Sequence, residues 1–233
     1  MQLSERLQTV VNMITKGGKV ADIGCDHAYL SIYMIKHQIA ESVIAMDVNR
    51  GPLERARDNI RKSGYENQIN VRLSDGIKEL NVGEADTLLI AGMGGGLIQK
   101  ILSGNPEVLE QIQELVLQPQ SEIMEVRRFV EGIGFTLVDE NMVIDEGKYY
   151  VVLKAKRVVP QETYNNEVYY RYGKFLLEKK HLCMFSFLKQ EEKKNLAIIE
   201  SLEKHPSDRN EKTKEKIRKD NTYCREGLGY YDM

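Results

Sequence analysis

Apolar residues along the first 135 positions follow two alternating spacings. Short continuous apolar runs have the length of buried strands, and between them apolar residues return every three or four positions, the period of an amphipathic helix. The expected strands are KVADIG (19–24), SVIAMDV (42–48), INVRLSDG (69–76), DTLLIAGMGG (86–95) and LVLQPQ (115–120). The expected helices are 3–15, 28–38, 51–64, 97–104 and 122–135. Five strand–helix alternations predict a parallel, doubly wound α/β sheet.

The stretch TLVDENMVIDEGKYYVVLKAK (136–156) breaks this alternation. Two β-rich runs flank a turn at 145–148 with no helix between them, which indicates an antiparallel hairpin. Nicotinamide dehydrogenases usually end their sheet with a sixth parallel strand, whereas a methyltransferase-type sheet ends with an antiparallel strand inserted at its edge. The pattern therefore predicts a Rossmann-like class I methyltransferase fold, with a mixed seven-stranded sheet that ends in an antiparallel hairpin.

Beyond Pro160 the strand signal almost disappears. A long helical run covers 174–204, and a second helix restarts at Ser207, a good N-cap residue. The apolar residues expected on one face of the first run are Leu177, Phe185, Leu188, Leu196, Ile199 and Leu202. We expect two antiparallel helices packed as a coiled-coil-like hairpin. The predicted domains are 1–157, a cofactor-binding domain, and 158–233, a helical domain.

Composition limits the classes of protein that this chain can represent. Hydrophobic residues make up 42% and charged residues 29%, which fits a packed globular core. No segment approaches 18 consecutive apolar residues, and the N-terminus lacks the apolar core of a signal peptide. The three cysteines and four histidines are scattered without metal-ligand spacing. We therefore expect a cytoplasmic protein without a membrane span or a metal, and we expect a monomer.

The net charge of −2 is divided unevenly. Residues 156–233 carry 17 Lys and Arg against 13 Asp and Glu, so the rest of the chain is acidic. An acidic front joined to a basic tail fits a small-molecule site next to a surface that meets an anionic partner.

Several chemically active residues end successive strands of the predicted sheet. In an open α/β sheet, ligands bind beyond the carboxyl ends of the strands, at the point where the strand order reverses. The cofactor-binding candidates at these ends are Asp22, Gly24, Asp26, His27, Asp47, Val48, Asp75, Gly76, Ala91, Gly92, Met93 and Gly94.

The stretch VADIGCDHAYL (20–30) begins like a nucleotide-binding loop, but Asp26 and Ala28 stand where a G-x-G-x-G pattern would have glycines. A pyrophosphate needs a glycine-rich helix N-terminus and is repelled by a carboxylate. Asp47 could accept hydrogen bonds from both hydroxyls of a ribose. Asp75 could accept a hydrogen bond from an adenine amino group, and Asp26 or Asp22 could hold an ammonium group. Ribose, adenine and an amino-acid end without pyrophosphate describe S-adenosylmethionine.

Each of these residues also has an ordinary structural interpretation. Gly24 fits any strand-to-helix turn, Asp47 could cap the next helix, and Asp75 begins a common turn sequence. Cys25 fits a small buried position, and Asp86 lies at the entry end of its strand. Independent turns rarely place acids at three consecutive strand ends, and this joint placement favours a cofactor pocket.

The motifs VADIGCDHAYL, AMDVNRGPLERARDN, SDG and IAGMGG resemble those of the bacterial tRNA (adenine-22-N1)-methyltransferase family. LSERL, LQPQ and DEGKYYVVLKA are also similar, and the resemblance covers about residues 1–157. The resemblance implies a class I enzyme that uses S-adenosylmethionine to methylate N1 of an adenine in tRNA. It places cofactor contacts at Gly24, Asp26, Asp47, Asp75 and the turn 91–95.

N1 of neutral adenine keeps an in-plane lone pair, so the reaction needs no strong general base. The catalytic candidates are Asp26, to stabilise charge arriving on the base, Tyr29, to stack on an extruded base, and Gln118, to line the base pocket. Tyr29 could equally pack inward. Candidate phosphate contacts are Lys193, Lys194, Lys212, Lys214, Lys216, Arg218 and Lys219, although interspersed glutamates also fit a solvated helix face. Arg6 could sit above the cofactor or touch RNA.

Three other functions stay open at this point. The chain could be a methyltransferase for a protein or small molecule, which the basic tail disfavours. A nicotinamide oxidoreductase is disfavoured by Asp26 and by the terminal hairpin. A non-catalytic RNA-binding module with a helical arm is disfavoured by the complete set of acids.

Overall fold

The computed structural model describes residues 3–205 and 207–232. The chain divides into two compact units, Met1–Thr163 and Tyr164–Met233, which we call the sheet unit and the helical unit. This division falls a few residues after the expected boundary at 157.

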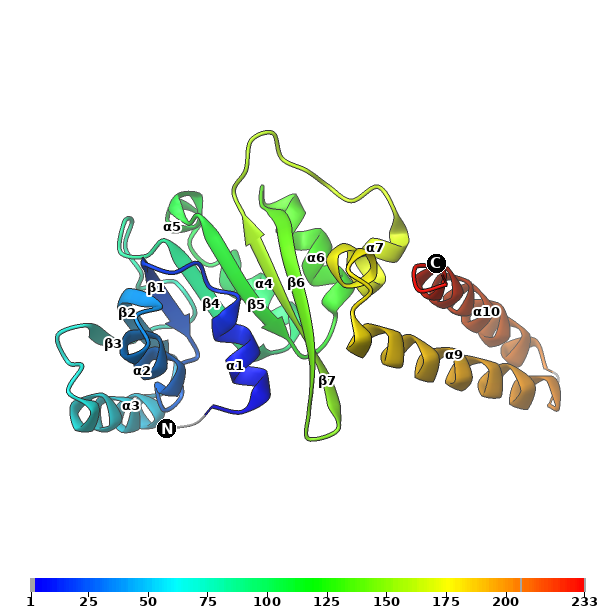
Figure 1. Ribbon diagram of the computed structural model, residues 1–233, viewed down its shortest axis with the longest axis horizontal. Helices are drawn as coiled ribbons and strands as arrows, with labels where there is room; N and C mark the ends of the chain where they lie inside the picture. Colours follow the sequence, from blue (N-terminus) through cyan, green and yellow to red (C-terminus); the bar gives the residue numbers. More distant parts are fainter. Residues whose placement is uncertain (1–2, 206, 233) are drawn as a thin grey trace. The chain divides into compact units, whose positions relative to one another are not determined.

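The sheet unit contains one seven-stranded sheet in the order β3-β2-β1-β4-β5-β7-β6 (Figure 1). The strands are β1 (Gly18–Ile23), β2 (Ala40–Asp47), β3 (Ile69–Leu73), β4 (Thr87–Met93), β5 (Glu114–Pro119), β6 (Thr136–Asp145) and β7 (Lys148–Lys156). The first five strands pair in parallel, and β7 lies antiparallel between β5 and β6. The predicted mixed sheet with its terminal hairpin is therefore confirmed.

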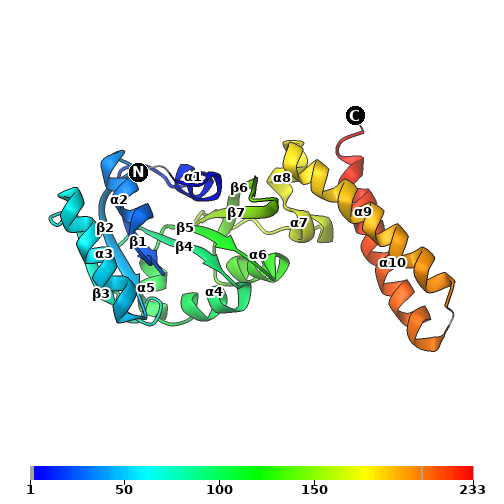
Figure 2. The ribbon, with the colours of Figure 1, turned by 90° about the horizontal axis from the view of Figure 1, so that it is seen from below.

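Helices cover both faces of this sheet (Figure 2). On one face lie α1 (Glu5–Asn12), α2 (Tyr29–Lys36) and α3 (Arg50–Ser63), and on the other lie α4 (Gly95–Leu102) and α6 (Ile123–Gly132). A short helix, α5 (Pro106–Gln111), precedes β5 and was not predicted. Helix α3 ends at Gly64, whose φ of 75° gives the left-handed C-cap expected of that glycine.

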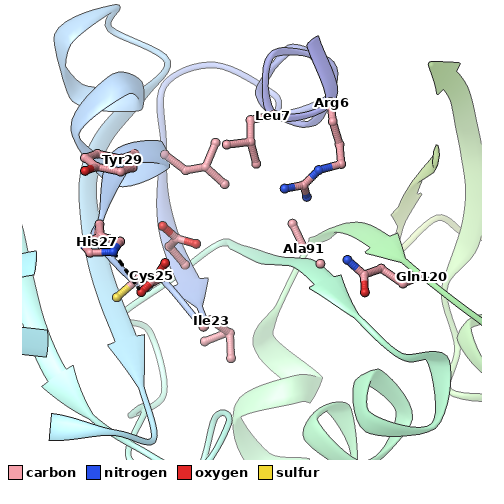
Figure 3. A pocket seen from close by; sticks show the side chains of 13 residues that line it. Arg6, Leu7, Ile23, Cys25, His27, Tyr29, Ala91 and Gln120 are labelled. Atoms are coloured by element: carbon pink, nitrogen blue, oxygen red, sulfur yellow. Dashed lines mark ion pairs between the residues drawn. The ribbon is translucent and has the colours of Figure 1, made fainter. Parts of the chain in front are cut away.

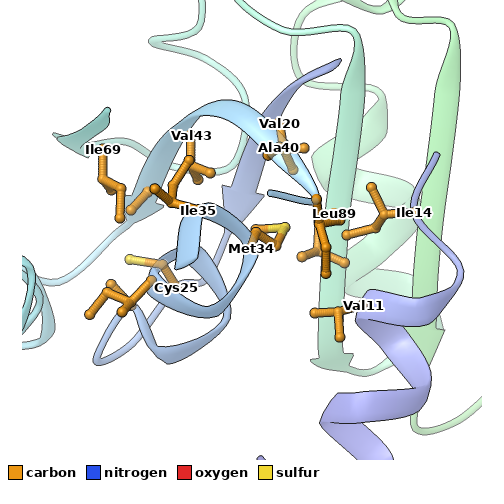
Figure 4. Close-up of a cluster of buried hydrophobic side chains, with 14 of the residues drawn as sticks. Val11, Ile14, Val20, Cys25, Met34, Ile35, Ala40, Val43, Ile69 and Leu89 are labelled. Carbon is orange, nitrogen blue, oxygen red and sulfur yellow. The ribbon is translucent and has the colours of Figure 1, made fainter. Parts of the chain in front are cut away.

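The core under α1, α2 and α3 is built from the predicted apolar periods. Val11 of α1, Met34 of α2, Val43 of β2 and Leu89 of β4 belong to one buried cluster (Figure 4). Burying an aliphatic side chain of this size contributes about 1.5–3 kcal/mol. This packing fixes the first helix and the loop before α2 against the carboxyl ends of β1 and β4.

The helical unit contains α7 (Glu167–Tyr172), α8 (Lys174–Glu178), α9 (Leu182–Glu203) and α10 (Asp208–Gly229). Ser207 caps α10 as expected, because its side chain accepts a hydrogen bond from the backbone N–H of Asn210. The prediction of one continuous helix over 174–204 is wrong, since the chain breaks between α8 and α9. Leu196 is also exposed rather than inward, and its neighbour Asn195 takes the buried position.

Candidate active site

The parallel pairing brings the ends of four strands to one edge of the sheet. Ile23 of β1 lies opposite Ile90 of β4, so Gly24 and Ala91 follow side by side. Asp47 lies opposite Leu73 and its carbonyl accepts a hydrogen bond of 2.9 Å from the backbone N–H of Ser74. The strand order reverses between β1 and β4, which is where open α/β sheets bind ligands.

Two adjoining cavities lie at this edge and share Ile23, Gly24, Ala91 and Gly92. The first, of about 240 Å³, we call the Asp22 cavity; it is lined by Arg6, Leu7, Asp22, Ile23, Gly24, Cys25, Asp26, His27, Tyr29, Leu30, Ala91, Gly92 and Gln120 (Figure 3). The second, of about 300 Å³, we call the Asp47 cavity; it is lined by Ile23, Gly24, Asp47, Val48, Asn49, Ser74, Asp75, Gly76, Ala91, Gly92, Met93, Leu97 and Ile101. Because they share these residues, the two cavities form one crevice along the carboxyl ends of β1, β2, β3 and β4.

Asp22 is the buried acid of the crevice, with only 3% of its surface exposed. Its carboxylate accepts a hydrogen bond of 2.6 Å from the hydroxyl of Ser31. Burial raises the pKa of Asp22 from 3.8 to about 6, and the hydrogen bond from Ser31 only partly opposes this shift. A buried carboxylate of this kind favours a bound cation, because the cation restores the electrostatic stabilisation that water would give.

The loop between β1 and α2 has glycine-like backbone conformations although only the first of the three pattern positions is a glycine. Gly24 has a φ of 74°, and Asp26 and Ala28 also adopt positive φ, of 47° and 59°. The backbone therefore takes left-handed conformations at the three positions of the G-x-G-x-G pattern, two of them with side chains that make this conformation unfavourable by roughly 1–2 kcal/mol each. Non-glycine residues held in this region cluster at functional sites.

Asp26 and the two rings beside it form the outer wall of the Asp22 cavity. The side chain of Asp26 is 65% exposed, and its Oδ1 lies 3.6 Å from Nε2 of His27 and 3.8 Å from an amino group of Arg55. The His27 and Tyr29 rings are stacked with centroids 5.3 Å apart (Figure 3). Tyr29 is 44% exposed, so the inward-packed alternative for this residue does not hold.

The Asp47 cavity combines two acids with apolar side chains. Asp47 accepts a hydrogen bond of 2.8 Å from the backbone N–H of Asn49, and Asp75 pairs with the ammonium group of Lys78 at 2.5 Å. This pairing lowers the pKa of Asp75. Val48 and Leu97 are 59% and 48% exposed, which leaves apolar surface uncovered beside the acids. Such a wall suits the flat face of a purine.

Eleven of the twelve predicted cofactor residues line one of the two cavities. The exception is Gly94, which is the N-cap of α4. The lining residues that were not predicted as site residues are Leu7, Ile23, Cys25, Leu30, Asn49, Ser74, Leu97, Ile101 and Gln120; of these, Cys25 was expected only at a small buried position. Gln120 is the last residue of the predicted strand 115–120, and Asn49 and Ser74 lie one and two positions from the ends of two other predicted strands, so including every polar residue near a strand end could have found them.

Gln118 does not line either cavity. It is fully buried, and its Oε1 accepts a hydrogen bond of 2.9 Å from Nη1 of Arg6, while its amide nitrogen donates to the carbonyl of Pro119. Arg6 reaches the Asp22 cavity instead. A contact of Gln118 with the base therefore stays a prediction, and in this structure each end of its amide group makes one hydrogen bond within the protein.

The helical unit exposes most of the lysines expected to contact phosphates. Lys193 and Lys194 lie on α9, and Lys212, Lys216 and Lys219 lie on α10 at a spacing that puts these three on one helix face. Lys214 does not fit this group, because it is 91% buried and its ammonium pairs with Glu211 at 2.7 Å. Arg218 is exposed but pairs with Glu203 at 2.8 Å.

Cys25 and Asp86 lie where their ordinary structural interpretations place them, outside a chemical role. Cys25 is 8% exposed, and burial together with Asp22 and Asp47 raises the pKa of its thiol, so the group stays protonated. Asp86 accepts a hydrogen bond from the backbone N–H of Lys19 at the opposite edge of the sheet.

In residues 3–205 and 207–232, the structure contains no group of three His, Cys, Asp or Glu residues placed to hold a metal ion. No helix in the same described ranges has the length and apolarity to cross a membrane.

Comparison with known proteins identifies the family. A family model for a methyltransferase domain matches residues 3–153. A tRNA (adenine(22)-N(1))-methyltransferase of Bacillus subtilis is 40% identical over 156 residues, which are 67% of this chain and 66% of the relative.

Solved structures cover almost the whole chain. The crystal structure of the B. subtilis m1A22 tRNA methyltransferase TrmK is 31% identical, covers 97% of this chain and 99% of its own, and superposes with a TM-score of 0.85. A Streptococcus pneumoniae protein in complex with S-adenosyl-L-methionine is 27% identical, covers 97% of this chain and 100% of its own, and has a TM-score of 0.84. The chain belongs to the methyltransferase-domain family and, within it, to the bacterial tRNA (adenine-22-N1)-methyltransferase family.

Proposed function

We propose that this chain transfers a methyl group from S-adenosyl-L-methionine to N1 of the adenine at position 22 of tRNA. The observation that carries the proposal is the crevice at the carboxyl edge of the sheet, where Asp22, Asp47 and Asp75 end or follow three neighbouring strands. Family membership supports the same reaction, since the B. subtilis relative carries this activity in its name. We further propose that the chain works in the cytoplasm as a monomer.

The residues of the crevice fit S-adenosyl-L-methionine on the evidence of their own chemistry. Asp47 presents a carboxylate suited to ribose hydroxyls, and the exposed faces of Val48 and Leu97 suit the adenine ring. Asp22 and Asp26 give the other cavity the negative charge that a cationic amino-acid end requires. When bound, this cofactor supplies a methyl group that its sulfonium makes electrophilic.

The protein's own part in the reaction is positioning. Because N1 of neutral adenine has a free lone pair, no residue needs to remove a proton first. Orientation of reactants alone is worth about 7–11 kcal/mol of the barrier. We assign stacking of the extruded base to the exposed ring of Tyr29, and stabilisation of the positive charge that the ring gains to Asp26.

The proposed reaction is tested by nucleoside analysis. Purified protein is incubated with S-adenosyl-L-methionine and unmodified tRNA, and the digested RNA is analysed by mass spectrometry. We expect N1-methyladenosine, and we expect its loss when adenine 22 is replaced by guanine. Methylation of N6 instead, or turnover of only a protein or small molecule, would refute the assignment.

Replacing Asp47 by alanine should weaken cofactor binding by about 1–3 kcal/mol, because hydrogen bonds from ribose hydroxyls to a charged acceptor are lost. Isothermal titration with S-adenosylhomocysteine measures the change. Asp58→Ala is a matched control, since Asp58 is an exposed acid of α3 that lies outside the crevice. Unchanged affinity in Asp47→Ala would remove this residue from the site.

Replacing Lys212, Lys216 and Lys219 together by glutamine should weaken tRNA binding and make it less sensitive to salt. Each phosphate contact contributes about 0.9 to the slope of log affinity against log salt, so three contacts should lower the slope by about 2–3. A triple replacement of Lys36, Lys62 and Lys148, exposed lysines of the sheet unit, gives the control. Equal loss in the two triple variants would contradict a specific role for α10.

A further inference from the structure

The turn that joins β4 to α4, residues 92–96, lies against both cavities. Gly92 lines the two cavities, and Met93 lines the Asp47 cavity. Gly92 has a φ of 79°, and the pairing of β4 with β5 shifts its register at this point. The resulting bulge brings Met93 onto the first loop of the site, because a Cβ added to Gly24 would overlap Cε of Met93. The position of this turn therefore sets part of the shape of the crevice.

The N-terminus of α4 is capped by a different loop, the one between β5 and α6. The N-cap of α4 is Gly94, which has no side chain to accept hydrogen bonds from the first N–H groups of the helix. Oγ of Ser121 accepts a hydrogen bond of 3.3 Å from the backbone N–H of Gly95. Oε2 of Glu122 accepts one of 2.8 Å from the backbone N–H of Gly96, where the helix dipole favours an anion. These two hydrogen bonds tie the turn to the loop.

Glu122 adopts an unfavourable backbone conformation at this place. It is the N-cap of α6, and its φ of 53° and ψ of 39° are left-handed, whereas N-cap residues normally have extended backbone. The left-handed region is unfavourable for a residue that carries a Cβ. Such a conformation persists only where the surrounding structure determines it, and it is common at functional sites. The carboxylate of Glu122 meanwhile binds α4 rather than the start of its own helix.

Gly95 lets the turn pack directly on this loop. A Cβ added to Gly95 would lie 2.7 Å from the carbonyl oxygen of Ser121, 2.9 Å from Cβ of Glu122 and 2.9 Å from Cγ2 of Val126. Heavy atoms do not approach a Cβ this closely, so even alanine would displace the turn or the loop. The φ of Gly95 is not positive, so a glycine is required here by the lack of space and not by the backbone conformation.

We infer that Gly95, Ser121 and Glu122 form a clamp that positions the β4–α4 turn for methyl transfer. This inference rests on the proposed function. The three residues lie outside the lining of both cavities, so they are positioning residues and not catalytic ones.

The clamp should matter more for the rate of methyl transfer than for the affinity of the cofactor. Cofactor affinity is shared among contacts along the ends of four strands. Methyl transfer instead requires N1 of the adenine to lie in line with the S–CH₃ bond, and a displacement of about 1 Å can cost about 100-fold in rate. A loosened clamp should therefore lower kcat while most of the binding remains.

The test measures kcat and cofactor affinity on the same variants, at a temperature at which circular dichroism shows each of them folded. Formation of N1-methyladenosine at saturating S-adenosyl-L-methionine and tRNA gives kcat, and isothermal titration with S-adenosylhomocysteine gives the affinity. Gly95→Ala should lower kcat by about 10- to 100-fold, and Glu122→Ala by about 5- to 20-fold. The affinity of both variants should change by less than about threefold. Glu122→Gln keeps an acceptor for Gly96 and should retain kcat within about threefold of the wild type.

Two variants of α6 serve as matched controls and should keep the wild-type kcat. In Gly132→Ala the new Cβ meets open space, and in Glu125→Ala an exposed acid is removed from the first turn of the same helix. The double variant Gly95→Ala with Glu122→Ala should lose less than the product of the two separate losses, because both residues act through the same turn.

Unchanged kcat in both Gly95→Ala and Glu122→Ala would overturn the inference while leaving the proposed function in place. Equal losses of kcat and of cofactor affinity would overturn it in favour of a general structural role. A Glu122→Gln variant as impaired as Glu122→Ala would overturn the hydrogen bond as the basis of the clamp. A wild type that forms no N1-methyladenosine would overturn the proposed function itself, and this inference with it.

Discussion

Replacing Glu140 by alanine should lower the free energy of unfolding of the sheet unit by about 3–5 kcal/mol. Glu140 lies in β6 and Arg127 in α6, with 0% and 1% of their side chains exposed, and Nε of Arg127 donates to Oε1 of Glu140 at 2.7 Å. The substitution removes a carboxylate from a guanidinium that stays buried. Restoring solvation to that charge requires the helix to move away from the sheet.

Chemical denaturation followed by circular dichroism measures this loss. Glu54→Ala, at an exposed position of α3, should change stability by less than about 0.5 kcal/mol. The double variant Arg127→Met with Glu140→Leu should recover most of the lost stability, since well-packed apolar residues can replace a buried ion pair. A loss below about 1 kcal/mol in Glu140→Ala would show that other groups satisfy the guanidinium without Glu140.

The elements that follow from local chemistry are predicted well by the sequence. The hairpin turn lies between Asp145 and Lys148 as expected, and Gly147 supplies a positive φ of 76° there. Helix α3 ends at the expected glycine. The missed helix α5 has clear start signals, because the side chain of Asn105 caps it and Pro106 occupies the first turn. These signals are local, but they directly follow Gly104, where the predicted helix 97–104 ends, and the segment was therefore assigned no helix of its own.

The break between α8 and α9 is not predicted by any local pattern. Lys180 has a φ of 51°, and the backbone N–H of His181 donates to the carbonyl of Leu176 across the break. The hydroxyl of Tyr231, about fifty residues further along the chain, lies 3.3 and 3.1 Å from the carbonyl oxygens of Leu176 and His181, so a distant residue packs against this point. The sequence from Lys174 to Lys204 has no proline or glycine, so its own pattern favours a continuous helix.

The acids at the strand ends and Arg6 of α1 also differ in how well the sequence predicts their place in the site. The acids Asp22, Asp47 and Asp75 could be located from sequence because parallel strands bring their carboxyl ends to one edge. Arg6 could not be assigned, because its environment depends on how α1 packs against strands that lie more than a hundred residues further along the chain. The sequence also does not show that Gln120 lines the crevice while Gln118 lies behind Arg6 and does not line it.

Replacing Asp22 by asparagine should stabilise the cofactor-free protein at neutral pH and weaken cofactor binding. The folded-state pKa of Asp22, about 6, lies above its ordinary value of 3.8. For an acid shifted in this direction, the stabilising effect is fully present below pH 3.8 and is lost as the pH rises through about 6. Ionised Asp22 therefore reduces stability at pH 7.5, by an upper value of about 3 kcal/mol. Asparagine removes this charge and keeps an acceptor for Ser31.

Denaturation at pH 5, 6, 7 and 8 should show a stability gain for Asp22→Asn that grows up to about pH 7 and then levels off, because Asp22 is ionised in both the folded and the unfolded protein above that pH, while Asp58→Asn shows none. Titration with S-adenosyl-L-methionine should show about 10- to 100-fold weaker binding by Asp22→Asn at pH 7.5, because a buried anion no longer faces the bound cation. The wild type should also bind more weakly below pH 6, where Asp22 becomes protonated, and the variant should lack this dependence. A variant that loses stability at neutral pH, or that binds as tightly as the wild type, would show that the charge of Asp22 does not serve the cofactor. The opposite signs of the two effects distinguish a functional carboxylate from a structural one, since a structural acid would lower both stability and affinity when neutralised.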